Sequence, residues 1–149
     1  MVEHVLDGIH QLSKAAAGDG FDQNLTVAVD VRDATARFDE VAAESLALWR
    51  SPQALETSYP MPTGDETGER LVSYLVIETI GHGWDLATTL DCQLEVDDQF
   101  ARQVLTVARS FSEETLRSPG MFGPEVAAPD DASALVELVC FLGRTAGSS

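Results

Sequence analysis

Residues 67–90 read TGERLVSYLVIETIGHGWDLATTL, and this stretch decides the fold class. Apolar residues recur along it at three- and four-residue steps, which is the spacing of one face of an α-helix. Thr67 is a suitable N-cap because its hydroxyl oxygen can accept a backbone N–H of the first helical turn. We therefore predict a long helix from Thr67 to about Leu90.

The same periodicity recurs on both sides of this stretch. The segment 2–17 carries one apolar stripe, and the Gly18-Asp19-Gly20 sequence that follows is typical of a helix end. Similar stripes predict further helices at 32–49, 97–116 and 134–142. A chain of 149 residues fits one domain, whose core needs no disulfide to be stable. The fold class predicted is all-α, with a bundle-like arrangement.

The segments between these helices have different signatures. Residues 21–31 alternate apolar and polar positions, which predicts a brief strand or an extended linker. Ser51-Pro52 should end the helix before it, and Pro60 and Pro62 mark 55–65 as a loop or an edge strand. The Gly-, Pro- and Asp-rich segment 118–131 should be a loop.

The charge balance excludes several classes of partner. Nine Lys and Arg residues stand against 25 Asp and Glu, a net charge of −16, so we expect no binding to nucleic acid or to an anionic membrane. No apolar run approaches the roughly 20 residues of a membrane span, and the N-terminus lacks the layout of a signal peptide. Cys92 and Cys140 have no metal-binding spacing, so we expect reduced thiols and a cytoplasmic protein.

One polar pair stands out on the long helix. At 100° per residue, one stripe about 120° wide has Glu78 and His82 at its centre. Burying an unpaired carboxylate costs several kcal/mol, so Glu78 needs a partner. The four-residue spacing lets both side chains converge on one ion, as in metal sites of helical bundles, or on each other in a metal-free hydrogen bond. The stripe contains Tyr74, Leu75, Glu78, His82, Asp85 and Leu86.

Further site residues follow from the same helical geometry. A third ligand has to come from another helix, and the remaining histidines, His4 and His10, both flank the apolar stripe of the first helix. Periodicity does not choose between them, and either is also compatible with a surface role. Asp85 lies three residues beyond His82 and can accept its ring N–H or bond a neighbouring helix. Tyr74 is a candidate pocket residue, and no catalytic residue is identified.

Residues 78–87, ETIGHGWDLA, resemble the E-x-x-x-H-G-W-D-L-A signature of the DinB-like metalloprotein superfamily. The most similar branch is the N-terminal domain group of the mycothiol-dependent maleylpyruvate isomerases, in an uncharacterised actinobacterial line. The resemblance extends to 3–8 (EHVLDG), which is similar to the first-ligand helix, and to 122–126 (FGPEV), 129–133 (PDDAS) and 142–144 (LGR) in the tail. It implies a four-helix bundle that holds one divalent ion with His4, Glu78 and His82, and a surface role for His10.

Two departures from this family affect the prediction. Family members usually begin with another helix before the ligand helix, so we expect 1–149 to be a single, N-terminally shortened DinB-like domain. The apolar surface that this helix covers would then be open, which predicts a homodimer. The isomerase proper also carries a C-terminal domain without a counterpart here, so maleylpyruvate is not implied as the substrate.

Three protein ligands leave a coordination position open, as in catalytic zinc sites. Zinc is the expected ion, and the mixed nitrogen and oxygen ligands also suit nickel or manganese. An open divalent ion lowers the pKa of a bound thiol and holds it as thiolate. With mycothiol supplied by the resemblance, we expect a metal-dependent thiol transferase or isomerase. The alternatives are a non-catalytic metal-binding or assembly module, and metal-assisted hydrolysis.

Overall fold

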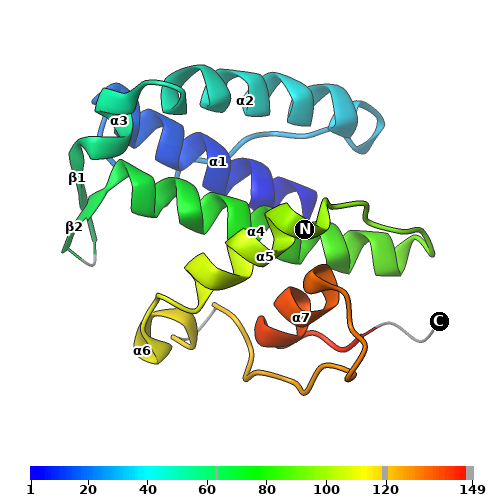
Figure 1. The fold of residues 1–149 in the computed structure, drawn as a ribbon. Helices are drawn as coiled ribbons and strands as arrows, with labels where there is room; N and C mark the ends of the chain where they lie inside the picture. The colour runs from blue at the N-terminus through cyan, green and yellow to red at the C-terminus, as the bar shows by residue number, and fades with distance from the viewer. Residues whose placement is uncertain (63, 119–120, 147–149) are drawn as a thin grey trace. The chain divides into compact units, whose positions relative to one another are not determined.

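The computed structural model describes residues 1–62, 64–118 and 121–146 (Figure 1). This part of the chain is mainly α-helical with one small antiparallel sheet, which confirms the predicted helical class at that level. Its contacts divide the chain into two compact units, Met1–Leu75 and Val76–Ser149. The elements are α1 (Val2–Ala17), η1 (Val31–Asp33), α2 (Ala34–Trp49), α3 (Pro52–Glu56), β1 (Ser58–Met61), β2 (Gly64–Thr67), α4 (Gly68–Thr89), α5 (Asp98–Ala108), α6 (Glu113–Leu116) and α7 (Ala134–Phe141).

In the first unit, α1 packs along α2, as the blue and cyan helices of Figure 1 show. Leu6, Ile9 and Val41 are buried between them because each helix has one apolar face. Gly18 ends α1 in the left-handed region, at φ 97°, and its N–H bonds the Ala15 carbonyl. Glycine adopts this conformation without steric cost. The predicted helix and its end are both confirmed.

The segment after α1 contains no strand, so the linker alternative is the one observed. Side chains of α1 bind its backbone. Asp7 Oδ1 accepts the Val27 N–H at 2.6 Å, and Gln11 Nε2 donates to the Leu25 carbonyl at 2.8 Å. Val27 itself is buried in the α1–α2 cluster. Polar side chains of α1 therefore make the backbone hydrogen bonds that a neighbouring strand would make in a sheet.

A second cluster in this unit buries Trp49, Tyr59 and Leu71. The Trp49 and Tyr59 rings meet edge to face, with centroids 5.9 Å apart. The edge-strand alternative predicted for 55–65 is the one observed, since β1 pairs with β2 in a two-stranded antiparallel sheet, although α3 occupies the start of this segment. Pro52 ends α2 but also suits the first turn of α3, where its missing N–H is not needed.

The predicted long helix is confirmed as α4, within one residue at each end. The Arg70 N–H points to the Thr67 hydroxyl at 3.4 Å, a long version of the expected cap. A Cβ atom at Gly68 would lie 2.0 Å from the Ala54 carbonyl oxygen, so only glycine fits where α4 begins. The helix runs from the first unit into the second, and Glu78 and His82 lie in the second.

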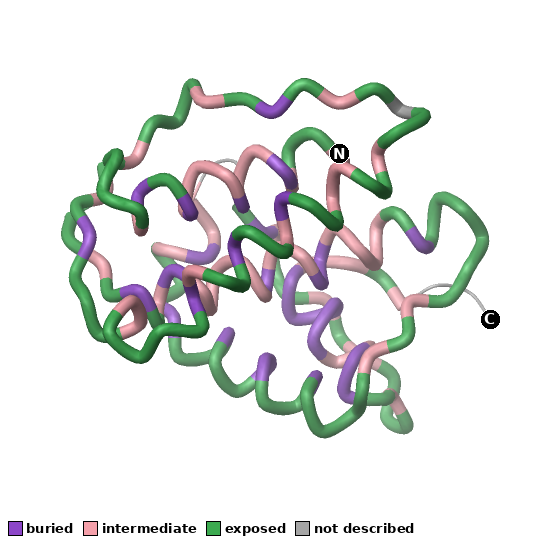
Figure 2. Tube along the Cα trace, turned by 90° about the horizontal axis from the view of Figure 1, so that it is seen from above, coloured by how far each residue is buried: buried purple, intermediate pink, exposed green. Residues whose placement is uncertain are grey.

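In the second unit, α5 packs against α7, and both helices bury apolar residues, among them Ala101 and Leu105 of α5 and Leu138 of α7. A hydrogen bond joins the first turns of the two helices, because Asp98 Oδ1 of α5 accepts the Ala134 N–H of α7 at 3.0 Å. Figure 2 shows buried positions recurring between exposed ones along the helices, as expected where each helix packs through one face.

The predicted helix 97–116 is interrupted, and this prediction was wrong in its second half. α5 ends at Ala108 and the short α6 starts only after Ser112. The Ser110 hydroxyl donates to the Val107 carbonyl at 2.6 Å, and Ser112 Oγ caps α6 by accepting the Thr115 N–H at 3.1 Å. Such local serine bonds compete with helix continuation.

The segment 118–131 is irregular wherever it is described, as predicted, and Ser133 caps α7. Cys92 is exposed, Cys140 is buried, and both are free thiols. Among the described residues, the helices are too short or too polar to cross a bilayer.

Candidate metal centre

Glu78, His82 and Asp85 lie on one face of α4 at successive helical turns. His82 Nε2 is 3.2 Å from Glu78 Oε2, and His82 Nδ1 is 3.4 Å from Asp85 Oδ2. The imidazole ring therefore lies between two carboxylates, one at each nitrogen. All three side chains are partly buried, with 21–28% of their surface exposed. The site is sheltered but remains within reach of a small ligand.

Asp85 is held by Arg144, which follows α7. Arg144 Nε donates to Asp85 Oδ1 at 3.1 Å and Nη2 donates to Oδ2 at 2.8 Å, a two-bond ion pair. Partial burial raises the pKa of Asp85. The hydrogen bonds and charge of Arg144, with a smaller contribution from His82, lower this pKa by more, so that it lies below the ordinary value. Asp85 is therefore ionised at neutral pH, and its carboxylate is a hydrogen-bond acceptor beside His82.

The helix makes room for Arg144 at a glycine. A Cβ atom at Gly81 would lie 3.3 Å from Arg144 Nη2, tighter than an ordinary van der Waals contact. The guanidinium also lies over the Phe122 ring, 5.6 Å from the centroid. Gly81 and Phe122, from two separate sequence segments, thus both contact the guanidinium that binds Asp85.

The remaining predicted site residues belong to the first unit. His4 lies in the first turn of α1 and is exposed, and His10 lies on the same helix and is partly buried. Tyr74 precedes Glu78 by one turn of α4 and is partly buried. Within the second unit, the structure brings Glu78, His82 and Asp85 together.

Sequence reasoning missed Arg144 as a site residue. It appeared only as the last residue of a tail motif, without a role. The available signal was Asp85 itself, because a partly buried carboxylate in an acidic chain needs one of the few cations. The partner follows α7 and is 59 residues away, so helical periodicity gave no means of finding it.

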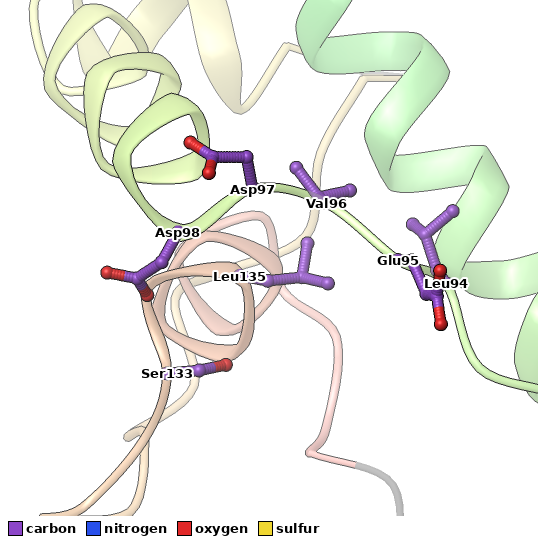
Figure 3. Close-up of a pocket in the computed structure, with 7 residues that line it drawn as sticks. All are labelled: Leu94, Glu95, Val96, Asp97, Asp98, Ser133 and Leu135. Atoms are coloured by element: carbon purple, nitrogen blue, oxygen red, sulfur yellow. The ribbon is translucent and has the colours of Figure 1, made fainter.

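A pocket of about 460 Å³ opens elsewhere in the second unit (Figure 3). Several of its polar groups already serve the backbone. Asp97 Oδ1 accepts the Phe100 N–H at 2.9 Å, and Ser133 Oγ accepts the Val136 N–H at 3.3 Å. Neither Glu78 nor His82 lines it. Its lining residues are Leu94, Glu95, Val96, Asp97, Asp98, Ser133 and Leu135.

Comparison with known proteins finds relatives but no family. No family model matches the chain, and no solved structure matches it. Two uncharacterised proteins of Mycobacterium tuberculosis, from strains CDC 1551 / Oshkosh and ATCC 25618 / H37Rv, are each 25% identical to it over 146 residues. Each match covers 97% of this chain and 78% of the relative. The similarity therefore extends along nearly the whole chain.

Proposed function

We propose that Glu78 and His82 of α4, together with His4 of α1, hold one divalent metal ion, with zinc as the first candidate and nickel or manganese as alternatives. The observation that carries this proposal is the 3.2 Å approach of His82 Nε2 to Glu78 Oε2 on one helix face. With His4, the set offers two imidazoles and one carboxylate, a combination suited to holding a metal ion.

The environment of His82 supports the same proposal. A metal-binding histidine usually donates its second ring N–H to a carboxylate, which fixes the ring and its tautomer. Asp85 lies on the Nδ1 side of His82 and Glu78 on the Nε2 side, so Nε2 is the nitrogen that faces the proposed ion. The donor set therefore fits a divalent cation.

The activity proposed for this site is a metal-dependent thiol S-transferase or isomerase with mycothiol as co-substrate. When bound, the ion would lower the pKa of a coordinated thiol and so supply a thiolate. Glu78 and His82 hold the ion from one helix face, and Asp85 orients His82. Tyr74, one turn before Glu78, is the proposed pocket residue. We also propose that the chain folds as a DinB-like four-helix bundle, that it is located in the cytoplasm and that it forms a homodimer.

The second candidate is a non-catalytic metal-binding or assembly module. It is favoured by one observation, which is that the pocket of Figure 3 is lined by neither Glu78 nor His82. A protein that kept the ligands but had no adjoining substrate pocket would bind metal without turnover.

One experiment separates these candidates. The protein is loaded with zinc, and the loss of free mycothiol is followed with a panel of electrophiles, with and without a chelator. The Glu78→Ala variant serves as the metal-free control. Chelator-sensitive loss supports the transferase or isomerase, and stoichiometric zinc without thiol loss supports the binding module. A wild-type protein that retains no divalent ion overturns the proposed metal site.

A further inference from the structure

We propose that Arg144 is a positioning residue for this metal site, acting on His82 through Asp85. The inference rests on the proposed function, and it gives a role to a residue outside the ligand set. Arg144 reaches the carboxylate from the tail after α7, 59 residues away in sequence.

The contact between Arg144 and Asp85 fixes orientation as well as charge. Two parallel bonds, at 3.1 and 2.8 Å, match the planar fork of a guanidinium to the plane of a carboxylate. A lysine ammonium is a single point charge and does not impose this plane. Arg144 therefore determines how the Asp85 carboxylate is turned on the face of α4.

Asp85 transmits this orientation to His82. The same oxygen, Oδ2, accepts from Arg144 Nη2 and lies 3.4 Å from His82 Nδ1. The tautomer with its proton on Nδ1, facing that oxygen, leaves Nε2 unprotonated on the side of Glu78, where it would bind an ion. Releasing Asp85 from Arg144 would free both the carboxylate and the ring to rotate.

Arg144 is itself held from several directions. Its Nη1 donates to the Leu142 carbonyl at 3.0 Å, its guanidinium lies over Phe122, and Gly81 gives it room against α4. Only 18% of its side chain is exposed. A side chain already immobilised in this way loses little further entropy in holding Asp85.

Arg117 provides a matched control in the same unit. Its side chain is 17% exposed, it donates to the Gly123 carbonyl and, at 3.0 Å, to the Phe141 carbonyl, and it lies over the Phe141 ring. Its carboxylate partner is Glu113, which is 78% exposed. Arg117 thus joins the backbone at Gly123 to the end of α7 without binding Asp85. Its loss should therefore lower the stability of the fold and leave zinc affinity unchanged.

The test measures zinc affinity by competition with a chromophoric chelator, and thermal unfolding by circular dichroism. Arg144→Gln should weaken zinc binding by about tenfold or more, within the range found when carboxylate partners of metal-binding histidines are removed. Arg117→Gln should lower the unfolding temperature to a similar extent and change zinc affinity by less than about twofold. Equal zinc affinities in these two variants would overturn the positioning role.

A double-mutant cycle identifies the route through Asp85. In the Asp85→Asn background, Arg144→Gln should add less than about twofold to the loss of zinc affinity, because the interaction it removes is already gone. Additive losses would show that Arg144 acts by another path and overturn the proposal. In the cobalt-substituted protein, Asp85→Asn and Arg144→Gln should change the ligand-field spectrum in the same way, while Arg117→Gln leaves it unaltered.

Arg144→Lys covers the case in which Arg144→Gln does not fold. Lysine keeps the positive charge but cannot make the two parallel hydrogen bonds of the guanidinium, so we expect a severalfold weaker zinc affinity. Wild-type zinc affinity in this variant would overturn the proposal. A wild-type protein that binds no zinc overturns the proposed function and this inference together. Normal wild-type binding with an unaffected Arg144 variant overturns the inference alone.

Discussion

Gly143 approaches Gly123 so closely that a Cβ atom at Gly143 would lie 2.7 Å from the Gly123 Cα. Gly143 also has φ +83°, in the left-handed region that favours glycine. It follows α7, where its N–H bonds the Cys140 carbonyl at 3.0 Å. The turn at Gly143 leads directly into Arg144, so this glycine pair sets the point from which Arg144 extends.

We predict that Gly143→Ala destabilises the protein by about 2–5 kcal/mol. The left-handed conformation costs an alanine about 1–2 kcal/mol, and forcing a methyl group into a packed contact adds roughly 1–3 kcal/mol. Urea denaturation followed by circular dichroism measures the loss. Gly18→Ala is the matched control, because Gly18 has φ +97° and open space around its Cβ position. Equal losses in the two variants would show that the contact with Gly123 contributes nothing.

Asp98 gives a prediction on pH. The pKa of Asp98 lies below its ordinary value, chiefly because Arg102 donates a hydrogen bond to its carboxylate and secondly because the Ala134 N–H does so. Desolvation opposes this shift only in part. A carboxylate whose pKa is lower in the folded state stabilises the fold above its unfolded pKa, about 3.9, and this stability is lost as the pH falls through the folded value. Asp98→Asn should therefore unfold at lower urea than wild type at neutral pH.

This difference in urea midpoint should shrink as the pH falls below about 4 and disappear below the folded-state pKa of Asp98, where the carboxyl group is protonated in both states. Asp39→Asn, on an exposed position of α2, is the control for the general effect of removing one negative charge. A difference between Asp98→Asn and wild type that stays constant down to low pH would mean that the ionised carboxylate has no stabilising role.

The helices were predictable where one apolar stripe ran without competition. α1 and α4 have such stripes and begin and end at residues whose chemistry is visible in sequence, such as Gly18 and Thr67. The break between α5 and α6 was missed because the apolar spacing continues through Phe111, which is buried. There the bonds of Ser110 and Ser112 outweigh the periodicity, and these bonds depend on side-chain rotamers that a pattern does not encode.

The candidate site divides in the same way. Glu78 and His82 were predictable because two polar residues interrupt one helical stripe, and helix geometry places them together. Asp85 was predictable in position, but its partner Arg144 was not, since that contact depends on the path of the tail after α7. Local spacing reports neighbours one turn away, and it carries no information on contacts made between distant segments.

We predict that the purified protein retains about one divalent ion per chain. Glu78→Ala and His82→Ala should each lower zinc affinity by at least about a hundredfold, because each removes a direct ligand. Elemental analysis after dialysis measures the retained metal. Glu69→Ala, an exposed acidic residue at the start of the same helix, is the control. Full metal occupancy in both ligand variants would contradict the site assignment.

We also predict a homodimer. In the second unit, Leu90 is 64% exposed and Phe100 is 45% exposed, and these side chains would contribute to the apolar contact surface of the predicted dimer. Two-fold association would bury such a surface on both copies at once. The net charge of −16 opposes association, so the dimer should tighten as salt screens the repulsion.

Analytical ultracentrifugation at low and moderate salt tests the dimer. Leu90→Ser should weaken it, whereas Leu46→Ser, at a position of the first unit that is 55% exposed, should not. Monomers at both salt concentrations would contradict the prediction.

The choice between the two histidines of α1 provides the last prediction. His4 matches the ligand-helix motif in the resemblance at 3–8, and His10 has no counterpart there, so His4→Ala should weaken zinc binding and His10→Ala should leave it unchanged. The loss at His4 should be smaller than that at Glu78, because His4 lies in the first turn of α1, where helix ends fray. Chelator competition on both variants, with circular dichroism to verify the helix content, gives the comparison. Equal zinc affinities in the two variants would remove the basis for choosing His4, and a loss confined to His10→Ala would reassign the third ligand.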